Sequence, residues 1–196
     1  MGDRPARRET FAERKARRGG IDDPEVVLAA AARFLETRSR SEAEVRRRLI
    51  TAGYRADLVE AAVARLIDLR MLDDEAFARA WVESRDRSQP RGERAIREEL
   101  RHKGVDRETV VRVLDERRQA ALAGPDDGGA PVSADRGAAD RLLARHARSL
   151  ERVVDLRQRR QRAYALLARH GFDPETCREA AERLVTAPDE DAESGG

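Results

Sequence analysis

The feature that most constrains the fold is a short motif that occurs three times. It consists of a leucine, three further residues, a glycine and a bulky apolar residue, and it lies at residues 49–54, 100–105 and 167–172. A left-handed glycine just beyond a helix, followed by an apolar residue that contacts the leucine, is the Schellman ending of a helix. The sequence therefore predicts three helices, each ending at the glycine of its motif.

A second helix is expected after each glycine, because apolar residues recur there with a period of about 3.6 residues. They stand six, nine, ten and thirteen residues after the glycine. The first copy has Val59, Ala62, Val63 and Leu66, the third has Cys177, Ala180, Ala181 and Leu184, and the second has Val110, Val113 and Leu114 with Arg117 in the last place.

A further helix precedes each of these pairs. The first starts at Asp23-Pro24, the second at Asp73-Asp74, and the third, with a weaker pattern, spans about 138–150. The predicted fold is all-α: three tandem three-helix repeat modules, at 22–72, 73–121 and 135–186, in an elongated, curved array. Only seven of 196 residues are aromatic, which disfavours a sheet-rich alternative.

The segments outside the modules are polar. We expect a disordered basic extension at 1–21, a linker rich in Gly, Pro and Asp at 122–134, and a disordered acidic tail at 187–196. No apolar run is long enough for a membrane span, and residues 1–20 have no signal-peptide core. We therefore expect a cytoplasmic protein without a membrane partner.

No catalytic, cofactor-binding or metal-binding set is visible. The histidines at 102, 146 and 170 are scattered. Cys177 is the one cysteine of the sequence, which excludes a disulfide framework, and it occupies a core position of the repeat. Asp73-Asp74 is interpreted as a helix cap rather than as a metal pair. The sequence thus favours a protein that binds over an enzyme, and predicts no cofactor.

The charges nearly cancel in total but are unevenly placed. The chain has 40 basic and 38 acidic residues, yet 33–55 holds seven bases against three acids, 85–107 eight against five, and 136–169 ten against three. Basic helix faces repeated in this way are typical of proteins that follow an anionic polymer. The candidate binding residues are Arg40, Arg46, Arg47, Arg94, Arg97, Arg101, Lys103, Arg160 and Arg162.

Of two other interpretations of these basic helix faces, one stays open and one is disfavoured. The faces could be ordinary solvated surface held by pairs such as Glu93–Arg97. A helix-turn-helix reader of the DNA major groove is disfavoured, because the last helices of the first and third modules, 57–69 and 173–184, are net acidic.

Several of these motifs together resemble the RecX family, the bacterial regulators of the RecA recombinase. The first module carries Arg38-Ser39-Arg40-Ser41 ahead of the first glycine motif. The second carries the most specific stretch, residues 71–82 (MLDDEAFARAWV), followed by Gly92-Glu93-Arg94-Ala95-Ile96. The third ends in residues 165–172 (ALLARHGF). The resemblance covers roughly 25–185; the long basic extension and the insertion at 123–135 depart from it.

The resemblance implies a non-enzymatic modulator. Such a protein would bind the RecA–single-stranded-DNA filament in its groove and mostly inhibit ATP hydrolysis, strand exchange and co-protease activity in DNA repair and the SOS response. It would bind single-stranded DNA weakly and would be a monomer when free. The alternative is a nucleic-acid-binding helical module without a role at RecA.

Overall fold

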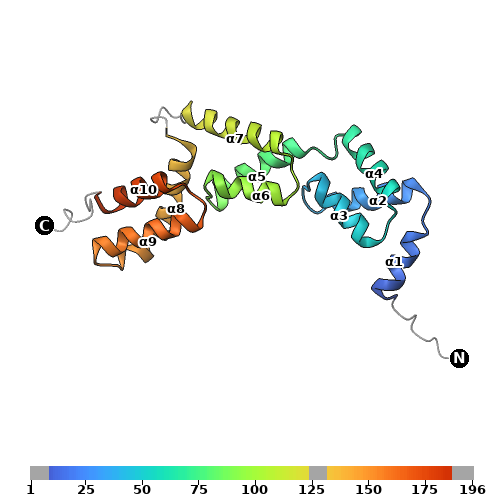
Figure 1. Ribbon diagram of the computed structural model, residues 1–196, viewed down its shortest axis with the longest axis horizontal. Coiled ribbons are helices and arrows are strands. Elements are labelled where there is room, and N and C mark those ends of the chain that lie inside the picture. Colours follow the sequence, from blue (N-terminus) through green and yellow to red (C-terminus); the bar gives the residue numbers. More distant parts are fainter. Residues whose placement is uncertain (1–8, 124–131, 187–196) are drawn as a thin grey trace. The chain divides into compact units, whose positions relative to one another are not determined.

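The computed structural model describes residues 9–123 and 132–186, which form two compact units (Figure 1). Unit 1 comprises 9–77 together with 103–106, and unit 2 comprises 78–102, 107–123 and 132–186. Within these described ranges every regular element is a helix. The all-α prediction is therefore confirmed, as are the tandem three-helix modules, although the second module contributes residues to both units.

The helices of unit 1 surround a core of Val, Leu and Ala side chains that includes Val27, Val45, Leu49 and Leu66. They are α1 (Phe11–Gly19), α2 (Pro24–Leu35), α3 (Glu42–Ala52), α4 (Ala56–Asp68) and the start of α5 (Asp74–Ser88). Unit 2 holds the rest of α5, α6 (Glu93–His102), α7 (Arg107–Leu122), α8 (Ala134–Glu151), α9 (Leu156–Arg169) and α10 (Pro174–Thr186).

The predicted helix endings are confirmed. The glycines of the three motifs have φ values of 103°, 82° and 82°, in the left-handed region. At the first, the Tyr54 N–H donates to the Leu49 carbonyl at 3.2 Å, and at the third the Phe172 N–H donates to the Leu167 carbonyl at 3.3 Å. These are the six-to-one hydrogen bonds of the Schellman motif.

The apolar register after each glycine is also confirmed. Val59, Val63, Leu66 and Cys177 are fully buried. In the second copy the last apolar position is taken by Arg117, whose side chain is only 5% exposed. Its guanidinium forms ion pairs with Asp86 at 2.9 Å and with Asp135 at 2.7 Å. A buried guanidinium needs such partners, because an unpaired charge in this position would strongly disfavour folding.

The prediction of disorder across 1–21 is wrong for the described part, where α1 forms. Thr10 and Glu13 make a capping box at its start, and Arg17 pairs with Glu9 at 3.0 Å. The helix contacts α3, where the Arg18 guanidinium donates to the Ala52 carbonyl at 3.4 Å. Polar caps and docking thus stabilise a helix that buries no residue of its own.

The other two predicted loose segments lie largely outside the described residues. Residues 124–131 and 187–196 belong to that undescribed part. The helices flanking the linker extend to Leu122 and from Ala134, so α8 begins four residues before the predicted start of its helix at 138. Ser133 supplies the missed start signal, since its hydroxyl accepts the Arg136 N–H as a helix cap.

A three-part contact, here called the module joint, links the first module to residues of the second within unit 1. The Ser41 hydroxyl donates to the Lys103 carbonyl at 2.5 Å. The Glu42 N–H, an orphan donor of the first turn of α3, donates to Asp74 at 2.8 Å. Ala43 lies so close to Gly104 that a β-carbon on Gly104 would stand 2.3 Å from the Ala43 Cβ.

The same joint recurs inside unit 2 between the second and third modules. The Gly92 N–H donates to the His170 carbonyl at 3.1 Å. The Glu93 N–H donates to Asp135 at 3.0 Å. A β-carbon on Gly171 would stand 2.3 Å from the Ala95 Cβ. In both joints the start of one glycine-ended helix is therefore capped by the next module and packs on that module's glycine turn.

The third module has no counterpart of this contact on α9. Ala43 and Ala95 stand ten and nine residues before the glycine of their own motif, and the same places before Gly171 hold Gln161 and Arg162. Long polar side chains cannot approach a glycine turn as alanine does. The third module thus has a polar helix face where the first two modules have the alanine of a joint.

The close approach of Ala43 to Gly104 predicts that a glycine-to-alanine substitution changes stability in opposite directions at Gly104 and at Gly137. Gly104→Ala combines a strained left-handed alanine with a clash against Ala43, and should lower the free energy of unfolding by more than about 2 kcal/mol. Gly137→Ala lies within α8, where the new methyl meets only the flexible end of Arg141 at 3.3 Å. This control should raise stability by about 0.5–1 kcal/mol. Urea unfolding followed by circular dichroism measures both; equal stabilities would contradict the joint.

Candidate anion-binding surface

Four of the nine predicted binding residues are already neutralised by carboxylates within the protein. Arg46 pairs with Glu42 and Glu60, Arg97 with Glu93 at 2.6 Å, and Arg101 with Glu98 at 2.7 Å. Arg40 is partly exposed and stacks on the Phe34 ring at 4.2 Å. A guanidinium held by a neighbouring carboxylate is less available to an external anion, because the new contact must replace the old one.

Lys103 is part of the first module joint. Its ammonium lies 2.9 Å from Glu44, which Arg38 also contacts at 3.1 Å. Burial opposes ionisation of Glu44, but the hydrogen bonds from Lys103 and Arg38 outweigh it and hold the pKa of Glu44 below its ordinary value. The structure thus gives Lys103 a partner that the sequence pattern did not suggest.

Four of the predicted residues remain unpaired within the described chain. Arg47, Arg94, Arg160 and Arg162 are exposed and make no hydrogen bond or ion pair with any described residue. Arg47 lies on α3 in unit 1, and the other three lie in unit 2. The structure places Arg160 and Arg162 two residues apart on α9 and therefore on different sides of that helix. Arg94 lies on α6.

The helix α9 is the most basic element of unit 2. It contains no acidic residue between Leu156 and Arg169, and the carboxylate just before it, Asp155, caps its start by accepting the Gln158 N–H. Asp155 is thereby committed to the backbone. The guanidinium groups on the outer side of α9 consequently lack an acidic neighbour on their own helix, unlike those of α3 and α6.

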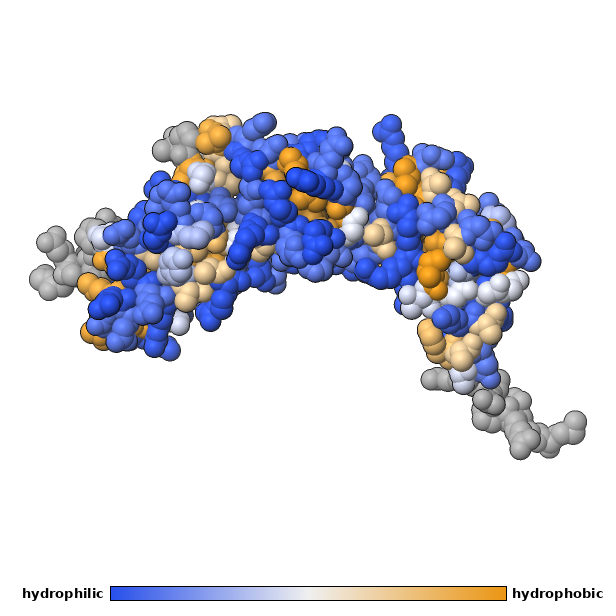
Figure 2. Space-filling model, viewed as in Figure 1, coloured by the Kyte–Doolittle hydropathy of each residue, from blue (hydrophilic) through white to orange (hydrophobic). Residues whose placement is uncertain are grey.

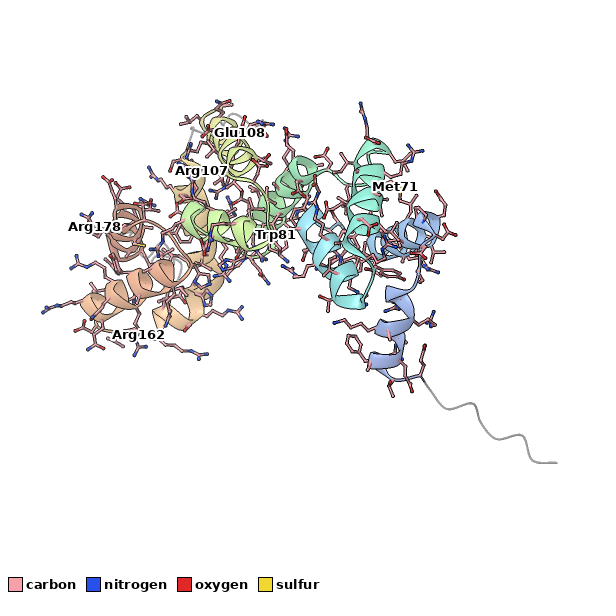
Figure 3. All side chains as sticks on the ribbon, turned by 45° about the vertical axis from the view of Figure 1, so that its right-hand side comes forward. Met71, Trp81, Arg107, Glu108, Arg162 and Arg178 are labelled. Atoms are coloured by element: carbon pink, nitrogen blue, oxygen red, sulfur yellow. The ribbon has the colours of Figure 1, made fainter. Side chains whose placement is uncertain are left out.

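The cations of α9 border a cleft of about 420 Å³ against α10. Arg157 and Arg160 from α9 and Arg178 from α10 line it beside Tyr164, and Glu182 is its one acidic residue. Figure 3 marks Arg162 on α9 and Arg178 on α10. We call Arg157, Arg160 and Arg178 at this cleft, together with Arg162 on another side of α9, the α9 basic surface.

Sequence reasoning missed two members of this surface. Arg178 lies on a net-acidic helix, so the charge balance hid it. Arg157 precedes Arg160 by three residues and Tyr164 by seven, a spacing that places all three on one side of a helix. That periodicity was the available signal for Arg157. The contribution of Arg178 depends on how α10 packs against α9.

The Asp73-Asp74 pair serves as the sequence predicted, in helix capping. Asp73 accepts the N–H groups of Glu75 and Ala76 at 2.9 Å, and Asp74 accepts that of Glu42 in the joint. No group of acidic, histidine or cysteine side chains among the described residues could hold a metal ion. Cys177 is fully buried, and burial raises the pKa of its thiol, so it remains a protonated core residue.

Charged and polar residues dominate the surface. Figure 2 shows hydrophilic residues over most of the visible face of each unit, with apolar residues only in small patches. Among the described helices, none has the length and apolar composition needed to cross a bilayer. The arginines of the α9 basic surface are suited to binding anions, because a planar guanidinium can donate two hydrogen bonds to a phosphate or carboxylate group.

Two protein-family models match the chain in sequence order. The first three-helix domain of RecX matches residues 28–66, and the second three-helix domain of RecX matches residues 73–114. A protein named regulatory protein RecX from Mycobacterium sp. (strain KMS) is 37% identical over 148 residues, covering 76% of this chain and 75% of the relative. Regulatory protein RecX from Mycobacterium tuberculosis (strain ATCC 25177 / H37Ra) is 32% identical over 151 residues, covering 76% and 79%.

A solved structure has the same fold. The crystal structure of RecX from Lactobacillus salivarius matches with a TM-score of 0.67 at 19% sequence identity, covering 83% of this chain and 97% of that one. At this identity the match concerns the arrangement of helices. It supports the tandem helical modules described above.

The ion pair of Lys103 predicts a dependence of stability on pH. Because the pKa of Glu44 is lowered in the folded state, its contribution is fully present above its ordinary value of 4.5 and is lost as the pH falls below it. Between about pH 6 and pH 3.5 the wild-type protein should therefore lose more unfolding free energy than Glu44→Gln. Urea unfolding at the two pH values measures the difference, and an equal loss in both proteins would contradict it.

Proposed function

The chain belongs to the RecX family of regulatory proteins, and from this premise we propose that it regulates the RecA recombinase. It binds the RecA–single-stranded-DNA filament in the groove of that filament. Bound there, it suppresses ATP hydrolysis, strand exchange and co-protease activity in DNA repair and the SOS response. It acts without a cofactor and as a monomer that the filament recruits.

The observation that carries this proposal is the α9 basic surface. Arg157, Arg160 and Arg162 are exposed and have no carboxylate partner among the described residues. A filament groove presents DNA phosphates and acidic protein side chains, and both groups are bound by guanidinium forks. Binding there gives these arginines counter-charges in place of the carboxylate partners that they lack among the described residues.

Several separated contacts on one chain support inhibition at low concentration. Exposed unpaired arginines occur in both units, at Arg47 in unit 1 and at Arg94 and the α9 basic surface in unit 2. Once one contact forms, the others bind at a high effective concentration, so weak contacts combine into firm binding. A protein held on several filament subunits opposes the rearrangements that ATP turnover and strand exchange require.

Charge reversal on α9 tests the proposal. Arg160→Glu combined with Arg162→Glu should raise the concentration that half-inhibits the ATPase of a cognate RecA filament at least tenfold, or about 1.4 kcal/mol. The matched control reverses two exposed charges elsewhere, Arg65→Glu on α4 and Arg87→Glu on α5. It should inhibit like the wild type, and far-ultraviolet circular dichroism should be unchanged in all proteins.

The result that would contradict the proposal is full inhibition by the α9 variant. The second candidate function, a nucleic-acid-binding module without a role at RecA, is favoured by the same arginines. It predicts binding to single-stranded DNA with a steep salt dependence and no change in RecA ATPase activity at any concentration of the wild-type protein.

A further inference from the structure

The helix α1 covers the first glycine turn as the module joints cover the other two. A β-carbon on Gly53 would stand 2.6 Å from the Lys15 backbone oxygen and side chain. The Arg18 guanidinium donates to the carbonyl of Ala52, the residue just before that glycine. In the joints the equivalent carbonyls belong to Lys103 and His170. At the Gly53 turn, α1 takes the place that the start of the preceding module's glycine-ended helix takes at the other two turns.

This docking brings Arg18 to a cleft of about 330 Å³ in unit 1. Arg33 comes from the last turn of α2 and Arg48 from α3, and the rings of Phe34 and Tyr54 complete its polar and aromatic lining. The remaining lining residues are alanine and leucine, so no acidic side chain lines the cleft.

The guanidinium groups lie near the aromatic rings. Arg18 is 5.5 Å from the centre of the Tyr54 ring, and Arg48 is 5.6 Å from that of Phe34. Arg33 and Arg48 are exposed and make no hydrogen bond or ion pair with any described residue. The cleft therefore offers several unused N–H donors beside π-surfaces and provides no carboxylate to neutralise them.

This combination favours one class of ligand. Single-stranded nucleic acids bind to grooves that pair arginines with phosphates and stack bases on aromatic or guanidinium planes. The volume is at the lower end of the range for small-ligand sites, about 300–1,000 Å³, which suits a single nucleotide of an extended strand. An acidic peptide would satisfy the arginines and leave the rings without a role.

We propose that α1, α2 and α3 form a binding site for single-stranded nucleic acid, in which Arg18, Arg33 and Arg48 bind phosphates and Tyr54 and Phe34 contact bases. The inference rests on the proposed function in one respect, because the strand that the site would hold in the cell is the filament's DNA. It assigns a role to the N-terminal segment, whose helix supplies one of the three cations.

The test measures binding of the full-length protein to a fluorescently labelled oligothymidylate by anisotropy over a salt series. The variant Arg33→Gln/Arg48→Gln should bind at least about tenfold more weakly near 0.1 M salt. Its slope of log affinity against log salt should be shallower by about 1.4, because each phosphate contact to a single strand contributes about 0.7. The control, Arg65→Gln/Arg87→Gln, removes two exposed charges elsewhere and should match the wild type.

Unchanged affinity and slope in Arg33→Gln/Arg48→Gln would overturn the site. Unlabelled oligothymidylate and polyglutamate are then compared as competitors for the labelled oligonucleotide. Equal displacement by the two would overturn the choice of nucleic acid over an acidic protein as the ligand. A parallel RecA ATPase assay separates the two proposals. If the wild type inhibits the RecA ATPase and Arg33→Gln/Arg48→Gln binds the oligonucleotide as tightly as the wild type, only this site is rejected. If the variant loses oligonucleotide affinity but the wild type has no effect on the RecA ATPase, only the proposed function is rejected.

Discussion

The structure depends on the contact between the start of one glycine-ended helix and the glycine turn of the next module. Gly104 and Gly171 are constrained twice, by a left-handed backbone and by an alanine that occupies the space of a side chain. The N–H groups of Glu42 and Glu93 gain aspartate partners from the following module. Modules of about 50 residues bury little apolar surface alone, so such contacts supply stability that each module lacks.

The joint also explains which cations are left for a partner. The helices α3 and α6 carry glutamates in their first turns, next to the joint, and these pair with Arg46, Arg97 and Lys103. The helix α9 instead has its start capped by Asp155 from its own module and carries no glutamate. Arg157, Arg160 and Arg162 are exposed and lack an acidic neighbour on their own helix for that reason. The α9 basic surface thus follows from a helix whose start is capped within its own module.

Sequence reasoning predicted the periodic part of this protein well. The glycine endings and the apolar register after them follow from local rules, and the structure confirms both from Val59 to Ala181. It missed what depends on contacts between distant residues. The pairing of Lys103 with Glu44 spans 59 positions, the cleft joins Arg157 to Arg178, and α1 is stabilised by docking on the Gly53 turn. No local pattern encodes these contacts.

The most direct measurement of the central claim is a cryo-electron microscopy map of a cognate RecA–single-stranded-DNA filament with this protein bound. We expect α9 to face the groove, with Arg160 and Arg162 against DNA phosphates or acidic RecA side chains. A map in which the filament is contacted through the acidic helix α4, with Arg160 and Arg162 in solvent, would contradict it.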